Sequence, residues 1–232
     1  MTVLEQAGSL AKAARPFSEI PRLWLRIGDM TEAFFREELP YASAANTFYG
    51  VLVFTGVAGI FSILSSVIGS MFATTPAAAQ SMNTLMGARV LLFCFDLVLT
   101  PVSFYLNAGV LYICAQIFGG KGGFTAQAYL VSLFYVPLGF VSTIASLALL
   151  VRGVGPILFA IVAFGIVIYH LRLTTRVFKA IHGFSTGKAI AAVLAPLVLI
   201  IIPVCMIAVL ALMGPAIGNV FSGIISSLTP TP

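Results

Sequence analysis

Five long runs of apolar residues dominate the pattern of the chain, separated by short polar or glycine-rich segments. They are Thr47 to Met71, Val90 to Phe118, Thr125 to Leu150, Ile157 to about Leu171, and Ala189 to Met213. A helix needs roughly 20 residues to cross a hydrocarbon core of about 30 Å. The fourth run is shorter, so whether it crosses completely is left open. Because no run shows strict alternation, the pattern excludes a β-barrel and predicts an all-α membrane protein with five transmembrane helices.

Glycine and proline are expected to end these helices. The segments 119–123 and 152–156 are too short to be anything but turns, the first of them the turn of a helical hairpin between helices two and three. Gly214 and Pro215 are expected to close the fifth helix. A stretch rich in Pro, Ala, Ser and Asn, residues 73–88, is expected to break the chain between the first two helices.

One amphipathic helix is predicted from Pro21 to Glu38, ahead of the first run. Its apolar face holds Ile20, Leu23, Trp24, Ile27, Met30, Phe34 and Phe35, and its polar face holds Arg22, Arg26, Asp29 and Arg36. Two arrangements follow. The helix lies in the cytoplasmic headgroup region with its aromatic side chains in lipid, or its apolar face packs on the protein's own loops.

Charged residues are few and unevenly distributed. Asp, Glu, Lys and Arg make up 8% of the 232 residues, against roughly 25% in soluble domains, so a freely soluble enzyme is excluded. Eleven of these 19 residues precede residue 47. The expected division is a cytoplasmic head at 1–46, a membrane domain at 47–213 and an uncharged outer amphipathic tail at 214–232, which lies in the outer leaflet, against the bundle or on a partner.

The positions of Lys and Arg predict the orientation. A cytoplasmic N-terminus and an external C-terminus leave only Arg89 and Arg152 outside, and place the other basic residues on the cytoplasmic side. Since these residues lie beside apolar spans, anionic lipid headgroups are the expected partner and nucleic acid is not. The expected interfacial lipid contacts are Arg22, Trp24, Arg26, Phe34, Phe35, Arg172, Arg176 and Lys179.

Asp96 is the one acidic residue of the membrane domain. It begins a polar line spaced i, i+4, i+7 and i+11 along the second helix: Asp96, Thr100, Ser103 and Asn107. An intramembrane carboxylate is costly, which makes the line a candidate site. It is either an ion or proton site beside a kink at Pro101, or a set of polar contacts between helices with Asp96 protonated or paired to Arg89.

Small residues form a stripe on the first helix. Its members are Thr55, Gly59, Ser62, Ser66 and Ser70. Such stripes let helices approach closely. The partner is either another helix of the same chain or a second copy in a homodimer.

Catalytic and cofactor motifs are not found. The segment 183–188 has one residue too few between its glycines for a phosphate loop, and Ala189 stands where a hydroxyl is required. His170 and His182 are expected to be interfacial side chains and not metal ligands, because no acid lies nearby. No nucleophile occurs together with a base. We therefore expect a protein that is not an enzyme and that holds neither a metal nor another cofactor.

Three segments carry a family resemblance. They are Ala108 to Leu111, Gln116 to Phe124 with its Gly-Gly-Lys-Gly-Gly turn, and Phe134 to Leu138, and the basic connector Tyr169 to Ala192 fits the same pattern. Over about residues 30–213 the chain resembles the prokaryotic branch of the Yip1 family. The resemblance implies this membrane fold, placed in the cell inner membrane, and no established reaction.

The expected function is that of a non-enzymatic multi-pass membrane protein. It would act as a scaffold or accessory subunit that organises the membrane, other membrane proteins or a second copy of itself. The alternative is a small transporter or channel-like protein that uses the intramembrane Asp96.

Overall fold

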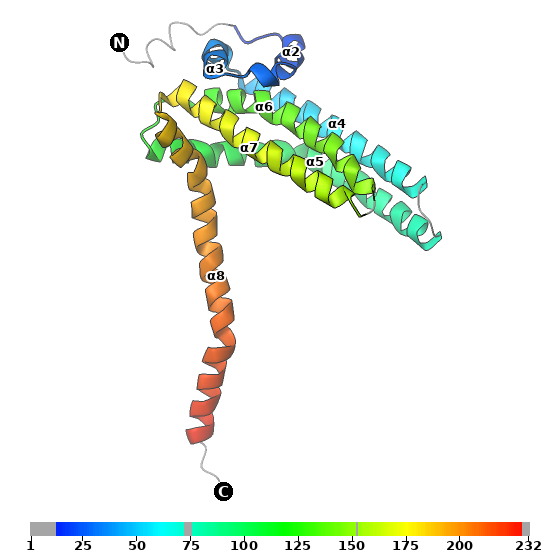
Figure 1. Ribbon diagram of the computed structural model, residues 1–232, viewed down its shortest axis with the longest axis vertical. Helices are drawn as coiled ribbons and strands as arrows, with labels where there is room; N and C mark the ends of the chain where they lie inside the picture. Colours follow the sequence, from blue (N-terminus) through cyan, green and yellow to red (C-terminus); the bar gives the residue numbers. More distant parts are fainter. Residues whose placement is uncertain (1–12, 72–75, 152, 229–232) are drawn as a thin grey trace. The chain divides into compact units, whose positions relative to one another are not determined.

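The computed structural model describes residues 13–71, 76–151 and 153–228, and its regular structure over these residues is entirely helical. The long helices are α4 (Ala44–Met71), α5 (Pro76–Ile117), α6 (Phe124–Ala145), α7 (Gly155–His182) and α8 (Thr186–Leu228) (Figure 1). All five are long and apolar enough to cross a membrane. The prediction of an all-α protein with five transmembrane helices is confirmed.

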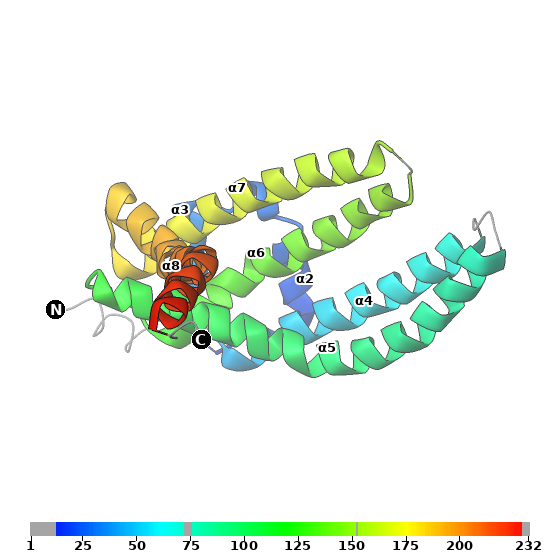
Figure 2. The same ribbon diagram turned by 90° about the horizontal axis from the view of Figure 1, so that it is seen from below.

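The chain forms two compact units, residues 1–193 and 194–232. In the first unit α4 packs on α5 and α6, and α6 packs on α7 (Figure 2). Every residue of α6 from Gln127 to Phe134 is buried, so this helix forms the centre of the core. In the second unit the described residues continue α8 as a helix that is apolar on all sides, as a membrane span requires.

The fourth helix is longer than the sequence pattern predicted. α7 has 28 residues and continues through its basic segment to Gly183, whose φ of +67° is in the left-handed region. The Gly183 N–H donates to the Lys179 carbonyl oxygen at 3.1 Å, which satisfies one of the last carbonyls of the helix. α7 is therefore long enough to span the bilayer.

Two predicted helix boundaries are wrong. α5 begins at Pro76 and not near Val90, because proline suits a first turn and the alanines that follow favour helix. α8 continues through Gly214 and Pro215. A glycine ends a helix when it adopts a positive φ, and Gly214 does not have one.

The single helix predicted from Pro21 to Glu38 is also wrong. The structure has two short helices, α2 (Ile20–Trp24) and α3 (Glu32–Glu38), together with the 3₁₀ turns η1 (Phe17–Glu19), η2 (Ile27–Asp29) and η3 (Leu39–Tyr41). Thr31 is the cause of the break before α3. Its backbone is extended, and its hydroxyl oxygen accepts the Phe34 N–H at 3.3 Å, which starts a new helix.

The apolar face of this N-terminal segment packs on the protein itself. α2 lies against α6, and α3 lies against α7. Trp24, Phe34 and Phe35 are buried, with exposed fractions of 8%, 5% and 0%. These three side chains were expected to contact lipid, and the structure corrects this, because the helices of the bundle offer an apolar surface that covers them. The face therefore packs on the protein itself, as the second arrangement expected, but on the helices α6 and α7 and not on loops.

Candidate functional site

The polar line on α5 faces away from the other helices of the first unit. Asp96, Ser103 and Asn107 are exposed, and Thr100 is half-buried. The Ser103 hydroxyl donates to the Thr100 carbonyl oxygen at 3.0 Å, so part of the line is bonded within its own helix. α5 continues without interruption through Pro101. The structure therefore places all four predicted residues on one helix without forming an internal site around them.

Arg89 does not pair with Asp96 among the described residues. Its Nη1 instead donates to the Ser62 carbonyl oxygen at 3.2 Å and to the Ser66 hydroxyl oxygen, both on α4. These acceptors lie across the α4–α5 contact, within reach of a long side chain. The pairing considered in the sequence analysis is replaced by a contact between two helices.

The small-residue stripe of α4 takes part in the same contact. A Cβ at Gly59 would lie 2.0 Å from the Phe93 ring of α5, so only glycine allows the two helices to approach this closely. Thr55 is buried and donates to the Val51 carbonyl oxygen at 2.8 Å. The stripe thus packs against α5 at Gly59 and bonds to Arg89 at Ser62 and Ser66, while the side chain of Ser70 lies outside the described residues.

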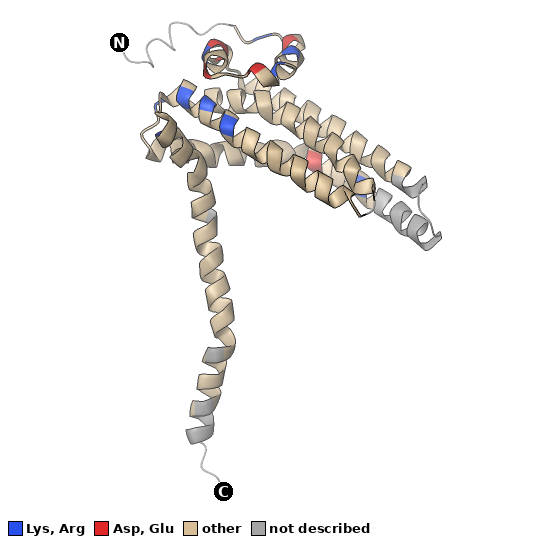
Figure 3. Cartoon of the chain, viewed as in Figure 1, with Lys and Arg blue, Asp and Glu red and all other residues tan. Residues whose placement is uncertain are grey.

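Polar side chains of α7 hold the N-terminal segment in place. The Tyr169 hydroxyl donates to the Ile27 carbonyl oxygen at 2.7 Å, and Arg176 donates to the Met30 carbonyl oxygen at 2.7 Å. Lys179 forms an ion pair with Glu32 at 2.9 Å. Figure 3 shows that the Lys and Arg residues of α7 gather in the part of this helix nearest the N-terminal helices.

This arrangement changes the roles of two predicted lipid contacts. The breaks between the short N-terminal helices leave carbonyl groups without helical partners, and such groups need donors. Arg176 supplies one donor, and Lys179 neutralises the carboxylate of Glu32. Arg22, Arg26 and Arg172 are exposed, and the Arg26 guanidinium lies 5.3 Å from the centre of the Phe34 ring; their contact with lipid headgroups stays a prediction.

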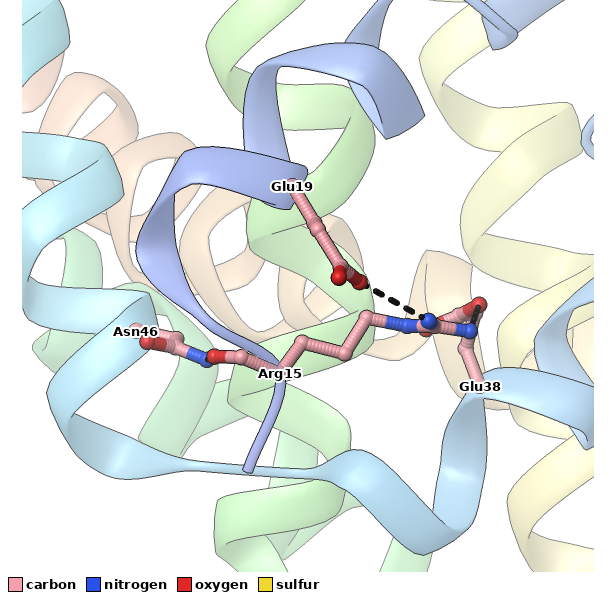
Figure 4. A network of polar contacts seen from close by, with 4 residues as sticks. All are labelled: Arg15, Glu19, Glu38 and Asn46. Atoms are coloured by element: carbon pink, nitrogen blue, oxygen red, sulfur yellow. Dashed lines mark hydrogen bonds and ion pairs between the residues drawn. The ribbon is translucent and has the colours of Figure 1, made fainter. Parts of the chain in front are cut away.

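An ion pair between Arg15 and the buried Glu38 joins the start of the N-terminal segment to the end of α3 (Figure 4). Arg15 binds the Glu38 carboxylate through two hydrogen bonds of 2.8 and 2.6 Å, and Glu38 is 3% exposed. The hydrogen bond with Glu38 raises the pKa of Arg15 above its ordinary value. The Asn46 side-chain amide donates to the Arg15 carbonyl oxygen at 2.9 Å, which ties this pair to the start of α4.

Acidification is expected to weaken the contact between α3 and α7. Hydrogen bonds from Lys179 and Arg36 hold the pKa of Glu32 below its ordinary value of 4.5. The stabilisation is complete above pH 4.5 and is lost as the pH falls through the lowered pKa. We expect a loss of at most about 1 kcal/mol, because the pair is partly exposed.

Trp24, on the neighbouring helix α2, reports whether the N-terminal segment as a whole stays packed on the bundle. It is the single tryptophan of the chain and lies buried beside Phe140, with ring centroids 6.2 Å apart. Its emission should move to longer wavelength between pH 6 and pH 3. The Glu32→Gln variant should emit at longer wavelength already at pH 6 and respond less to acid. An identical titration in both proteins would contradict the prediction.

His182 is at the centre of a buried network that joins four segments. The backbone N–H of Gly122 donates to Nδ1 of His182 at 3.0 Å, so Nδ1 is an acceptor. Nε2 must then carry the proton, and it donates to the side-chain oxygen of Gln127 at 3.1 Å. The Gln127 amide in turn donates to the Ala108 carbonyl oxygen at 3.1 Å. His182 is 6% exposed, so the expectation of an interfacial side chain is wrong at this position.

The glycine-rich turn between α5 and α6 is shaped by this histidine. A Cβ at Gly120 would lie 2.6 Å from Nδ1 of His182, and a Cβ at Gly122 would lie 1.9 Å from Cγ2 of Ile181. Gly119 has a φ of +76°, which side chains rarely tolerate. The turn therefore serves close packing against the end of α7.

A metal centre is not formed in the part of the chain that the structure describes. No group of three or more His, Cys, Asp or Glu side chains there is placed to hold an ion. The His182 network is fully bonded by amides and carbonyls, which fits a structural role.

The comparisons with known proteins give one match. A family model described as the Yip1 domain matches residues 34–208, which is more than half of the chain. The comparisons with curated proteins and with solved structures find no match.

Proposed function

The chain belongs to the Yip1 family, and on this premise we propose that it is a non-enzymatic scaffold or accessory subunit that binds another membrane protein along the exposed face of α5. Its helices and its family make it a multi-pass integral membrane protein. The observation that supports the proposal is the outward position of Asp96, Ser103 and Asn107.

The energetic argument begins with Asp96. Insertion scales assign a cost of about 2.5–3.5 kcal/mol to a carboxylate at the centre of a transmembrane helix. The residues beside Asp96 on α5 are mostly apolar, with Phe95 and Leu99 more than half exposed, and no ion pair with a basic side chain forms among the described residues. A protein partner that donates to the carboxylate would offset this cost.

The spacing of the line suits one partner helix. Asp96 and Asn107 lie 11 residues apart, which is about 16 Å along the helix axis at 1.5 Å per residue. Ser103 lies between them on the same face. A single transmembrane helix that carries Lys, Arg or amide side chains could bond to all three, as polar residues often do between membrane helices.

A transporter would need these residues to line an internal passage. In the first unit they face outward, which favours contact with a partner over conduction through the chain. The proposed placement is the cytoplasmic membrane of a prokaryotic cell, with the N-terminal segment in the cytoplasm near anionic headgroups and the C-terminus outside.

The test is site-specific photo-cross-linking in native membranes. A photoreactive amino acid at Ser103 should form an adduct with a transmembrane segment of another protein that carries a basic or amide side chain at the same depth. Asp96→Leu should reduce the yield about fivefold, since an interhelical hydrogen bond contributes about 1 kcal/mol.

Position Val167 provides the matched control, because it is similarly exposed but lies on α7. A probe there should give no adduct that depends on Asp96. An adduct of twice the mass of the chain would assign the face to a homodimer, and the absence of any protein adduct at Ser103 would contradict a partner on this face.

A further inference from the structure

A cavity of about 350 Å³ lies between α4, α5, α6 and the 3₁₀ helix η4 (Ser146–Leu150) that follows α6, at the end of the bundle away from the N-terminal segment. Its apolar wall includes Phe61, Leu149 and Leu150. Its polar wall consists of one arginine and a group of hydroxyl side chains: Arg89, Ser62, Ser65, Ser66, Thr143 and Ser146. No residue of the Asp96 line belongs to it, so the cavity is independent of the proposed partner surface.

With the start of α4 taken as one boundary of the hydrocarbon core, we infer that the cavity lies near the other boundary. Ser62 is 18 residues beyond Ala44, where α4 begins, which is about 27 Å along the helix. The hydrocarbon core is about 30 Å thick. The Arg89 side chain that bonds to Ser62 is therefore at the level where acyl chains meet headgroups.

Part of the Arg89 guanidinium has no partner among the residues that the structure describes. Only Nη1 donates to described residues, to the Ser62 carbonyl and the Ser66 hydroxyl oxygens. Nε and Nη2 share one edge of the group, and two parallel donors on one edge match two oxygens of a phosphate. The contact with α4 holds the side chain in position, so less conformational entropy is lost when a ligand binds.

The hydroxyl groups of the cavity act as acceptors. Ser65 donates to the Phe61 carbonyl at 2.6 Å, Thr143 to the Gly139 carbonyl at 2.9 Å, and Ser146 to the Thr143 carbonyl at 2.6 Å. Each hydroxyl has one hydrogen, which is used in these bonds, so its oxygen can only accept from a ligand. The cavity therefore presents donors on Arg89 and acceptors on the hydroxyl wall.

We propose that this cavity binds the headgroup of one phospholipid, with its phosphodiester on Arg89, its N–H or O–H donors on the hydroxyl oxygens, and its acyl chains along Leu149 and Leu150. Phosphatidylethanolamine combines the three features that this site requires: a phosphate, N–H donors in the headgroup and two acyl chains. Phosphatidylcholine carries the same phosphate but no N–H, and diacylglycerol has the chains without the phosphate.

The test is native mass spectrometry of the full chain, purified in mild detergent and titrated with each lipid. We expect one phosphatidylethanolamine per chain, bound about tenfold more tightly than phosphatidylcholine and than diacylglycerol, which is the effect of one hydrogen bond to a charged group. Inorganic phosphate at the same concentration should not displace it. Displacement would assign the site to free phosphate and overturn the proposal for a lipid.

Variants on both sides of the cavity keep the test decisive. Arg89→Gln should weaken binding of phosphatidylethanolamine about tenfold. Ser146→Leu fills the cavity while leaving Arg89 intact and should also prevent binding, so the outcome does not depend on the stability of one variant. Arg172→Gln, an exposed arginine on α7, is the matched control and should bind like the wild type. Equal affinities in all four proteins would refute the site.

Discussion

Gly122→Ala is expected to destabilise the protein by about 3 kcal/mol and to lower its melting temperature by about 6–12 °C. The added methyl group would lie 1.9 Å from Cγ2 of Ile181 and 3.1 Å from His182. Ile181 is 5% exposed and has little room to move. The turn would have to shift, and this would break the hydrogen bond from the Gly122 N–H to His182.

Gly123→Ala is the matched control, one residue further along the same turn. Nothing lies within 4 Å of a Cβ at Gly123, and its φ of −87° is accessible to alanine. Gly123 is the N-cap of α6, where alanine is less favourable than glycine, so we expect a loss of about 0.5–1 kcal/mol, well below that of Gly122→Ala. Thermal unfolding in one detergent measures both variants. An equal fall in melting temperature for both variants would contradict the prediction, because it would mean that contact with Ile181 and His182 does not cause the loss.

Glu38→Ala is expected to cost about 3 kcal/mol, because it leaves the Arg15 guanidinium without its two strongest hydrogen bonds. Arg15 is 25% exposed and can regain some water, which places the cost at the lower end of the range for broken buried pairs. The N-terminal segment should detach from α4, where Asn46 holds the Arg15 carbonyl.

Glu37→Ala provides the control for helix propensity and charge, because Glu37 is the neighbouring residue of α3 and is exposed. It should change stability by less than about 0.5 kcal/mol. The Arg15→Ala, Glu38→Ala double variant completes a cycle and should lose less than the sum of the single variants. Additive losses would mean that the two side chains do not stabilise each other.

Several polar contacts could not be inferred from the sequence, and His182 illustrates the reason. Its position in a basic segment after an apolar run suggested an interfacial side chain. It is buried because α7 continues to Gly183 and brings the ring against Gly122, 60 residues earlier in the chain. A repeated pattern of glycines around Lys121 was visible, but a pattern of glycines does not identify the group that approaches them.

The N-terminal segment shows the same limit. Its apolar face was identified residue by residue, yet the surface that covers it was not, since lipid and protein offer similar apolar environments. Thr31 carried a usable signal, because threonine is a preferred N-cap residue whose hydroxyl can accept a backbone N–H of the first helical turn. Arg15 and Glu38 carried no such signal. They are 23 residues apart, and their contact can be predicted only when the turns between them are known.

The sequence alone determined the class of protein, the five membrane-crossing helices and the glycine-rich turn between α5 and α6. These features depend on the free-energy cost of exposing polar backbone groups and charges to hydrocarbon. This cost is set by the residues of each segment itself, so each run of residues can be assigned from its own sequence. The tertiary structure decided which polar groups are in contact: Arg15 with Glu38, Arg89 with α4, and His182 with the turn. It also decided that Asp96 faces away from the other described helices of the first unit. Such contacts join residues far apart in the chain, and their free energy depends on packing that no local pattern records.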